Sequence, residues 1–108
     1  MMYYEFTAGN KQYKLRLSTR NTVALEKQLG CNPLAIFGTG DTIPTITSMV
    51  TILHYALQQY NHSITLNDAY DIFDEWLEEG NAVTDFIPVI IELYKVSGII
   101  KDGKEEKN

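Results

Sequence analysis

The sequence contains a single cysteine, Cys31, which excludes an internal disulfide and a cysteine-based zinc site. It has no apolar run near the roughly 20 residues needed to cross a bilayer. Its first residues also lack the basic and apolar regions of a signal peptide. These absences predict a cytoplasmic protein.

Positive charge is missing from most of the chain. Residues 28–94 contain no lysine or arginine, and the net charge of the whole chain is -5. The acids of this stretch are Asp41, Asp68, Asp71, Asp74, Glu75, Glu78, Glu79, Asp85 and Glu92. Because cations are needed to neutralise phosphates and anionic lipid, the pattern argues against binding to nucleic acid or to a membrane. It favours a basic protein partner, or serves only to keep the domain soluble.

The length of 108 residues and a hydrophobic content of 44% are typical of one folded domain. We expect residues 1–100 to form a single globular domain. Residues 101–108 contain no apolar side chain, and we expect them to form a flexible polar tail.

Residues 2–17 alternate in the manner of β-strands around Gly9 and Asn10, two residue types that tolerate positive φ. A two-residue turn there predicts a hairpin with the pairs Phe6–Tyr13, Tyr4–Leu15 and Met2–Leu17 on one face, and Glu5–Lys14 and Tyr3–Arg16 on the other. A two-stranded ribbon is marginally stable alone. It must therefore lie on helices or pair edge to edge with another chain.

Local signals predict a first helix over about 19–29, capped by Ser18 or Thr19 and ended by Gly30. Asn32 and Pro33 predict a one-turn helix that stops at Gly38, followed by a loop over residues 38–41.

Apolar spacing predicts three further helices. One covers about 44–60, with the stripe Ile46, Met49, Val50, Leu53, Leu57 and Tyr60. The next is capped by Thr65 with Asp68 at N3 and ends at Gly80, with the stripe Leu66, Ala69, Tyr70, Phe73, Trp76 and Leu77. The last begins between residues 81 and 87 and ends at Gly98, where Ile99 and Ile100 fit a Schellman ending.

Together these elements predict an α+β fold, with an N-terminal β-hairpin packed on a bundle of about four α-helices. The expected core consists of Leu15, Leu17, Val23, Leu25, Leu29, Phe37, Met49, Leu53, Leu57, Phe73, Trp76, Leu77, Ile90 and Leu93.

No catalytic, cofactor-binding or metal-binding residues are expected. His54 and His62 are eight residues apart, which is not the spacing of a helical metal pair. The acids of the third long helix lie opposite Phe73 and Trp76, so they look solvated rather than enclosed in a cleft. We therefore expect a protein that is not an enzyme and carries no cofactor.

The aromatic content points to protein binding instead. Seven tyrosines, four phenylalanines and one tryptophan give more large amphipathic surface than a small core readily hides. Tyrosine and tryptophan are common anchors of protein interfaces. The alternative is that the tyrosines line the seams between helices.

Several segments resemble tail assembly chaperones from long-tailed phages and prophages of Gram-positive bacteria. The clearest is residues 13–37, which contain Lys14-Leu15-Arg16-Leu17-Ser18-Thr19, then Val23-Ala24-Leu25-Glu26-Lys27-Gln28-Leu29-Gly30, then Asn32-Pro33-Leu34-Ala35-Ile36-Phe37. The resemblance continues in residues 44–60, 69–80 and 89–97, in the same order and spacing.

The resemblance implies a chaperone that binds the long helical tape measure protein, keeps it soluble and recruits tail-tube subunits before it leaves the finished tail. Such a protein works in the host cytoplasm and is absent from the mature virion. Two alternatives remain: a connector or tail protein that stays in the particle, and a small acidic regulator that sequesters a basic protein.

For any such partner, the predicted binding surface is what the aromatic residues leave exposed beside the acids. It consists of Tyr55, Tyr60, Tyr70, Phe86 and Tyr94, flanked by Asp71, Asp74, Glu75 and Glu78. We also expect self-association, because a hairpin edge and surplus aromatic residues are commonly covered by a second copy.

Overall fold

The computed structural model describes residues 2–38 and 43–101. Most of the predicted loop at 38–41 and of the predicted tail at 101–108 lies outside these residues. The elements are β1 (Tyr4–Ala8), β2 (Lys11–Leu15), α1 (Thr19–Leu29), η1 (Pro33–Phe37), α2 (Ile46–Leu57), α3 (Leu66–Glu78), η2 (Val83–Asp85) and α4 (Phe86–Val96).

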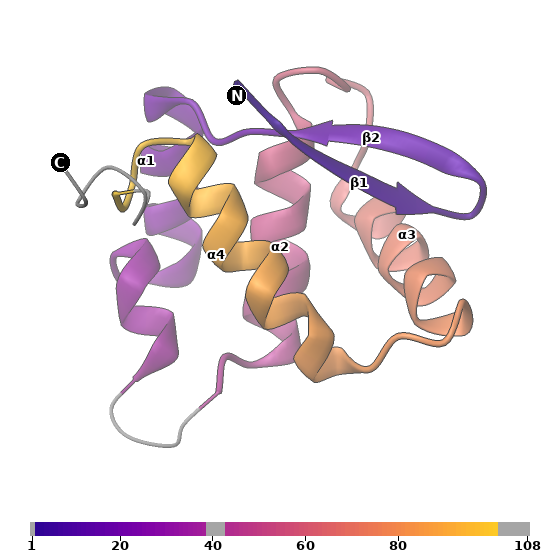
Figure 1. Cartoon of the computed structure of the whole chain (residues 1–108). Coiled ribbons are helices and arrows are strands. Elements are labelled where there is room, and N and C mark those ends of the chain that lie inside the picture. Colours follow the sequence, from indigo (N-terminus) through magenta and orange to yellow (C-terminus); the bar gives the residue numbers. More distant parts are fainter. Residues whose placement is uncertain (1, 39–42, 102–108) are drawn as a thin grey trace, which may run out of the picture.

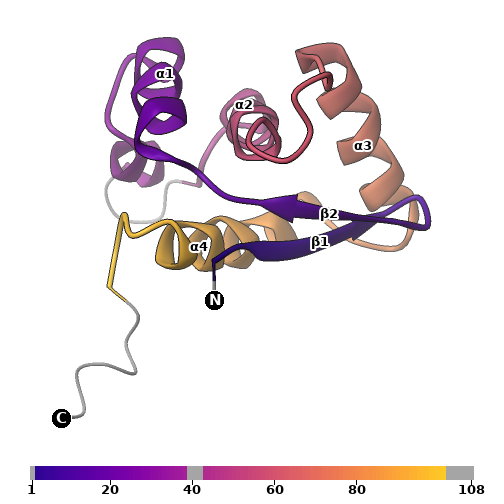
Figure 2. The same cartoon turned by 90° about the horizontal axis from the view of Figure 1, so that it is seen from above.

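The elements form two layers. Helices α1, α2 and α3 lie side by side in one layer, with α2 in the middle, and the hairpin and α4 form the other (Figure 1, Figure 2). The predicted α+β fold, a hairpin on four helices, is confirmed. The helices of the described residues include none with the length and apolar character needed to cross a membrane.

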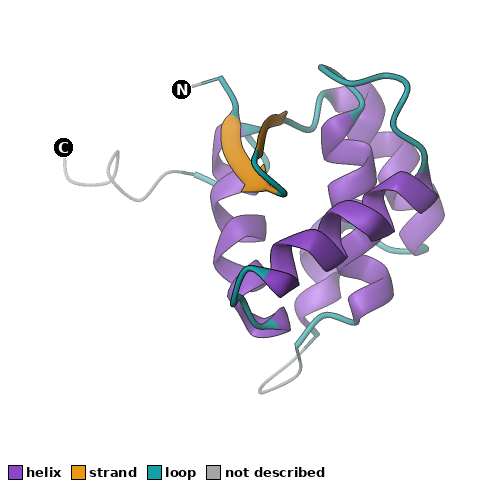
Figure 3. Ribbon diagram, turned by 90° about the vertical axis from the view of Figure 1, so that its right-hand side faces the viewer, coloured by secondary structure: helices purple, strands orange, loops and turns teal. Residues whose placement is uncertain are grey.

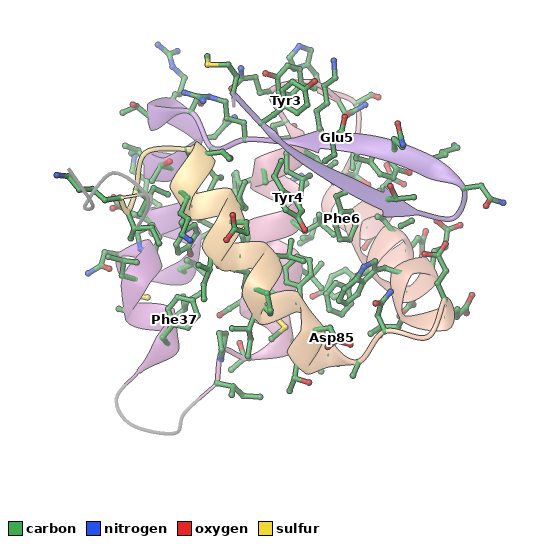
Figure 4. The ribbon with its side chains drawn as sticks, in the orientation of Figure 1. Tyr3, Tyr4, Glu5, Phe6, Phe37 and Asp85 are labelled. Atoms are coloured by element: carbon green, nitrogen blue, oxygen red, sulfur yellow. The ribbon has the colours of Figure 1, made fainter. Side chains whose placement is uncertain are left out.

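The hairpin has the predicted register over its ladder, with Phe6 opposite Tyr13 and Tyr4 opposite Leu15. The ladder ends there, so the predicted pairs Met2–Leu17 and Tyr3–Arg16 are not part of it. Gly9 and Asn10 have φ of +59° and +66°, as a primed two-residue turn requires. Tyr4 and Phe6 point into the molecule, whereas Tyr3 and Glu5 point away from it (Figure 4). The ribbon therefore lies on the helices, and Figure 3 shows its two strands, in orange, beside them.

The tip of the hairpin is held by α3. The Gly9 N–H donates a 2.7 Å hydrogen bond to Oε2 of Glu79. A Cβ atom added to Gly9 would lie 2.6 Å from Oε1 of Glu75. The carboxylates of Glu75 in α3 and of Glu79 at its C-cap, one helical turn apart, thus both lie at the turn, and Glu79 is hydrogen-bonded to it.

We expect Gly9→Ala to lower the free energy of unfolding by about 1 to 2 kcal/mol, and by more than Gly30→Ala, because alanine is strained at positive φ and its Cβ would also displace Glu75 from the turn. Urea denaturation measures this change. Gly30→Ala is the matched control, since Gly30 has φ of +76° but open space around it. An equal loss in both variants would show that the contact between the turn and α3 contributes nothing.

The helix ends follow the local signals. The Ser18 hydroxyl accepts the Asn21 N–H, and the Asn32 side chain accepts two N–H groups at the start of η1. At α3, Thr65 and Asp68 form the predicted reciprocal capping box, which also holds the pKa of Asp68 below its usual value. These caps depend only on neighbouring residues, which explains why the sequence predicts them.

The end of α4 is the predicted Schellman motif. The Ile99 N–H donates to the Tyr94 carbonyl at 2.9 Å and the Gly98 N–H donates to the Lys95 carbonyl at 3.2 Å. At its start, α4 follows the short η2, where the carboxylate of Asp85 accepts the Ala82 N–H. Pro88 lies in the first turn, as its missing N–H demands.

Two predicted stripes are displaced. Helix α2 begins at Ile46 and ends at Leu57, so Ile46 and Tyr60 lie at or beyond its ends and are exposed. On α3 the buried stripe is Ala69, Ile72, Phe73 and Trp76. Ile72 takes the place expected for Tyr70, and Leu66 and Tyr70 face solvent.

The core contains most of the predicted residues, with Leu29, Phe37 and Leu77 half-buried against it. Val23 is the exception, since 45% of it is exposed. Val23 and Leu25 are two residues apart on α1, about 200° around the helix axis, so they cannot both face inwards. Leu25 is fully buried, and Val23 therefore points outwards.

Candidate protein-binding surfaces

The structure divides the predicted aromatic surface. Phe86 and Tyr94 are fully buried, so they offer nothing to a partner, and this part of the prediction is wrong. Phe86 packs against Phe6, Phe73 and Trp76 with ring centroids 5.2 to 5.9 Å apart. The Tyr94 hydroxyl donates a 2.9 Å hydrogen bond to the Pro33 carbonyl. Both side chains bridge elements that are distant in sequence.

Tyr60 lies in a separate cluster at the hairpin. Its ring meets that of Tyr3 edge-on at 5.9 Å, and the Lys14 ammonium lies 5.0 Å from the Tyr3 centroid and 5.7 Å from the Tyr60 centroid. Such cation–π contacts are attractive, most of all when partly shielded from water. Tyr60 therefore packs the segment that follows α2 against Tyr3 and Lys14 of the hairpin region.

Tyr55 lies in a groove of about 500 Å³ between the start of α1 and the end of α2. The groove is lined by Ser18, Arg20, Asn21, His54, Tyr55, Gln58, Gln59 and His62. Burial lowers the pKa of His54, although a hydrogen bond with the Ile64 backbone acts in the opposite direction. Apart from the two histidines, Arg20 is the one side chain in this lining that carries a charge at neutral pH.

Tyr70 and the acids share the outer side of α3. Leu66 and Tyr70 are one helical turn apart and are 39% and 41% exposed. Beside them lie the exposed acids of the same helix, Asp71, Asp74 and Glu78. We call these five residues the α3 surface. Residues 2–38 and 43–101 contain one ion pair, Lys95 with Glu92, so the acids of the α3 surface have no cationic partner within them.

Glu75 lies nearer the hairpin turn than the other predicted acids. It is beside Gly9 and, together with Asp71 at the edge of the α3 surface, helps to line a groove of about 590 Å³ between β2 and α3. Burial, and secondly the charge of Glu75, raises the pKa of Tyr13. Glu75 therefore lies beside the hairpin, away from Leu66 and Tyr70.

A second exposed surface lies on α1 and was not predicted. Arg20, Val23, Ala24 and Lys27 line a shallow depression of about 730 Å³ on its outer side. We call these four residues the α1 surface. The spacing of the sequence could have predicted this surface. Counted from Arg20, Val23 is at i+3 and Lys27 at i+7, which places the three residues on one stripe of the helix.

The described residues bring no three histidine, cysteine or acidic side chains together in a metal-binding group. His54 and His62 do share the groove beside Tyr55, but they are joined there by polar and cationic groups. The arrangements with the clearest chemistry are thus the two charged, partly apolar helix surfaces.

Comparison with known proteins places the chain in a family. No curated protein and no solved structure matches it. Residues 5–108 match the family of unknown function DUF6096, and this match covers nearly the whole chain. The chain therefore belongs to the DUF6096 family.

Proposed function

We propose that this protein is a phage tail assembly chaperone that binds the tape measure protein and helps to recruit tail-tube subunits. The α3 surface carries this proposal: two exposed apolar side chains, Leu66 and Tyr70, lie among three carboxylates that have no cationic partner in the described chain. The resemblance of residues 13–100 to such chaperones supplies the identity of the partner.

An amphipathic helix of the partner fits this surface. Helix α3 is 13 residues long and exposes its apolar pair one turn apart, the spacing at which a second helix presents its own side chains. Lysine and arginine residues of the partner would face Asp71, Asp74 and Glu78. The apolar centre supplies most of the affinity, and the charges mainly speed the encounter.

Tyr70→Ser should weaken retention of the tape measure protein in a co-expression pull-down. An aromatic anchor at the centre of an interface contributes about 2 kcal/mol, roughly a thirty-fold change in affinity. Tyr60→Ser is the matched control, because Tyr60 is 39% exposed but packs against the hairpin. Equal retention by both variants would contradict the use of the α3 surface.

Neutralising Asp71, Asp74 and Glu78 to their amides should slow binding at low salt and leave the complex intact. Association rates measured at about 0.05 M and about 0.5 M salt separate these effects, since the higher salt screens surface charge. A complex abolished at both salt concentrations by the amide variant, yet unchanged by Tyr70→Ser, would contradict apolar binding.

The composition of the purified virion distinguishes a chaperone from a structural tail protein. A chaperone leaves before the tail is finished, so mass spectrometry of purified virions should not detect this protein. Its presence at a fixed number of copies per virion would identify a structural component instead.

A further inference from the structure

The α1 surface is basic with an apolar centre. Arg20, Val23 and Lys27 lie on one outward stripe, and the stripe contains no acid. It therefore carries two positive charges around a valine that is 45% exposed. Glu26, three residues after Val23, lies beside this stripe but is half-buried, so the two cations are the more exposed charges. Apolar side chains rimmed by polar groups mark interaction sites.

The α3 surface has the opposite charge and lies on the other outer helix of the same layer. Helix α2 separates α1 from α3, so the two surfaces are on the two flanking helices (Figure 2). Three carboxylates surround Leu66 and Tyr70 on α3, whereas two cations surround Val23 on α1. The helices are also similar in length, with 11 and 13 residues.

We propose that the α1 surface of one copy docks on the α3 surface of the next copy. Val23 then packs against Leu66 and Tyr70, while Arg20 and Lys27 face Asp71, Asp74 and Glu78. The two surfaces of a contact are different, so a pair of copies keeps one α1 surface and one α3 surface free after the first contact. Such a head-to-tail contact continues into an open chain or closes into a ring.

The occupant is a second copy because both complementary surfaces are present on every molecule. A contact of one helix with one helix is smaller than a standard stable interface, so the association is weak and depends on concentration. Its charges lie at the rim, which makes it sensitive to salt.

This inference is independent of the proposed function, because it concerns the protein alone. It does have a consequence for that function. The partner helix and the neighbouring copy use the same α3 surface, so binding of one displaces the other. Copies of this protein that bind the partner helix are therefore no longer part of the head-to-tail assembly.

Charge reversal tests the contact by sedimentation velocity. The wild-type sedimentation coefficient should rise with concentration at about 0.05 M salt and fall back at about 0.5 M. Arg20→Glu/Lys27→Glu should stay monomeric, and so should Asp71→Lys/Asp74→Lys, since like charges would then face one another. We expect a loss of about a hundred-fold or more in the association constant of each.

Mixing the two variants gives the decisive result. The unchanged α3 surface of the first variant meets the unchanged α1 surface of the second, so the mixture should associate although neither component does alone. Lys95→Glu/Lys101→Glu is the matched control for Arg20→Glu/Lys27→Glu, because it makes the same change in net charge outside both surfaces. Its association constant should decrease only slightly.

Val23→Ser and Tyr70→Ser test the apolar centre without a change of charge, and each should weaken self-association about tenfold or more. Circular dichroism verifies that every variant is folded. A wild-type protein that is monomeric at all concentrations overturns the proposal. Charge variants that associate as strongly as the wild type also overturn it, and this result would be expected if copies paired through the hairpin edges instead. A mixture of the two charge variants that remains monomeric overturns it as well.

Discussion

Replacing Phe86 with alanine should lower the free energy of unfolding by about 3 to 5 kcal/mol. Phe86 is fully buried at the start of α4, and its ring meets Phe73 of α3 at 5.2 Å and Phe6 of β1 at 5.9 Å. The truncation removes contacts with the hairpin and with α3 at once and leaves a cavity where three elements meet.

Denaturation followed by tryptophan fluorescence measures this loss. Trp76 is the sole tryptophan and its ring lies 5.5 Å from that of Phe86, so it reports on the same cluster. Tyr70→Ala is the control, an aromatic truncation on a solvent-facing side of α3 that should change the free energy by about 0.5 kcal/mol or less. A loss below about 1 kcal/mol for Phe86→Ala would remove Phe86 from the core.

Tyr94→Phe should lower stability by about 1 to 3 kcal/mol at neutral pH, because the buried Pro33 carbonyl loses its donor. This contact joins α4 to η1 across 61 residues of sequence. Because phenylalanine keeps the ring and its contact with Phe37, the change isolates the hydroxyl group.

The same substitution should change the response to alkaline pH. Burial, and secondly the charge of Cys31, raises the pKa of Tyr94 above its ordinary value of 10. Above pH 10 the unfolded chain releases this proton while the folded chain retains it. The stability that the raised pKa confers is therefore complete below pH 10 and is lost above it, by about 1.4 kcal/mol per pH unit.

Urea denaturation of both proteins between neutral pH and about pH 11 tests this linkage. The difference in stability between the wild type and Tyr94→Phe should be constant up to about pH 10 and shrink above it. Stabilities that decline in parallel above pH 10 would show that the Tyr94 hydroxyl ionises equally easily in the folded and unfolded chains.

The sequence predicted features whose causes are local. The register of the hairpin follows from Gly9 and Asn10, since a two-residue primed turn leaves one way to pair the strands. The caps at Ser18 and Thr65 involve residues three positions apart, and the ending at Gly98 involves the preceding turn. None of these depends on where the rest of the chain lies.

The errors concern apolar residues whose environment is set by other elements. Val23 is exposed and Ile72 is buried, although both are β-branched apolar residues on helices. Phe86 and Tyr94 were predicted at a surface and are in the core, because α4 lies against the hairpin and η1. Periodicity gives the spacing of a stripe, but the neighbouring elements decide which stripe is covered.

By itself, then, the sequence determined the strands, the helices, the ends that have local caps and the concentration of acids in the middle of the chain. The tertiary structure alone decided which aromatic residues reach solvent and that α2 separates the two charged helices. The physical reason is range: caps and turns are closed by hydrogen bonds within a few residues, whereas burial is settled by packing between distant segments. The side-by-side order of α1, α2 and α3 places a basic surface and an acidic surface on the two outer helices of one layer.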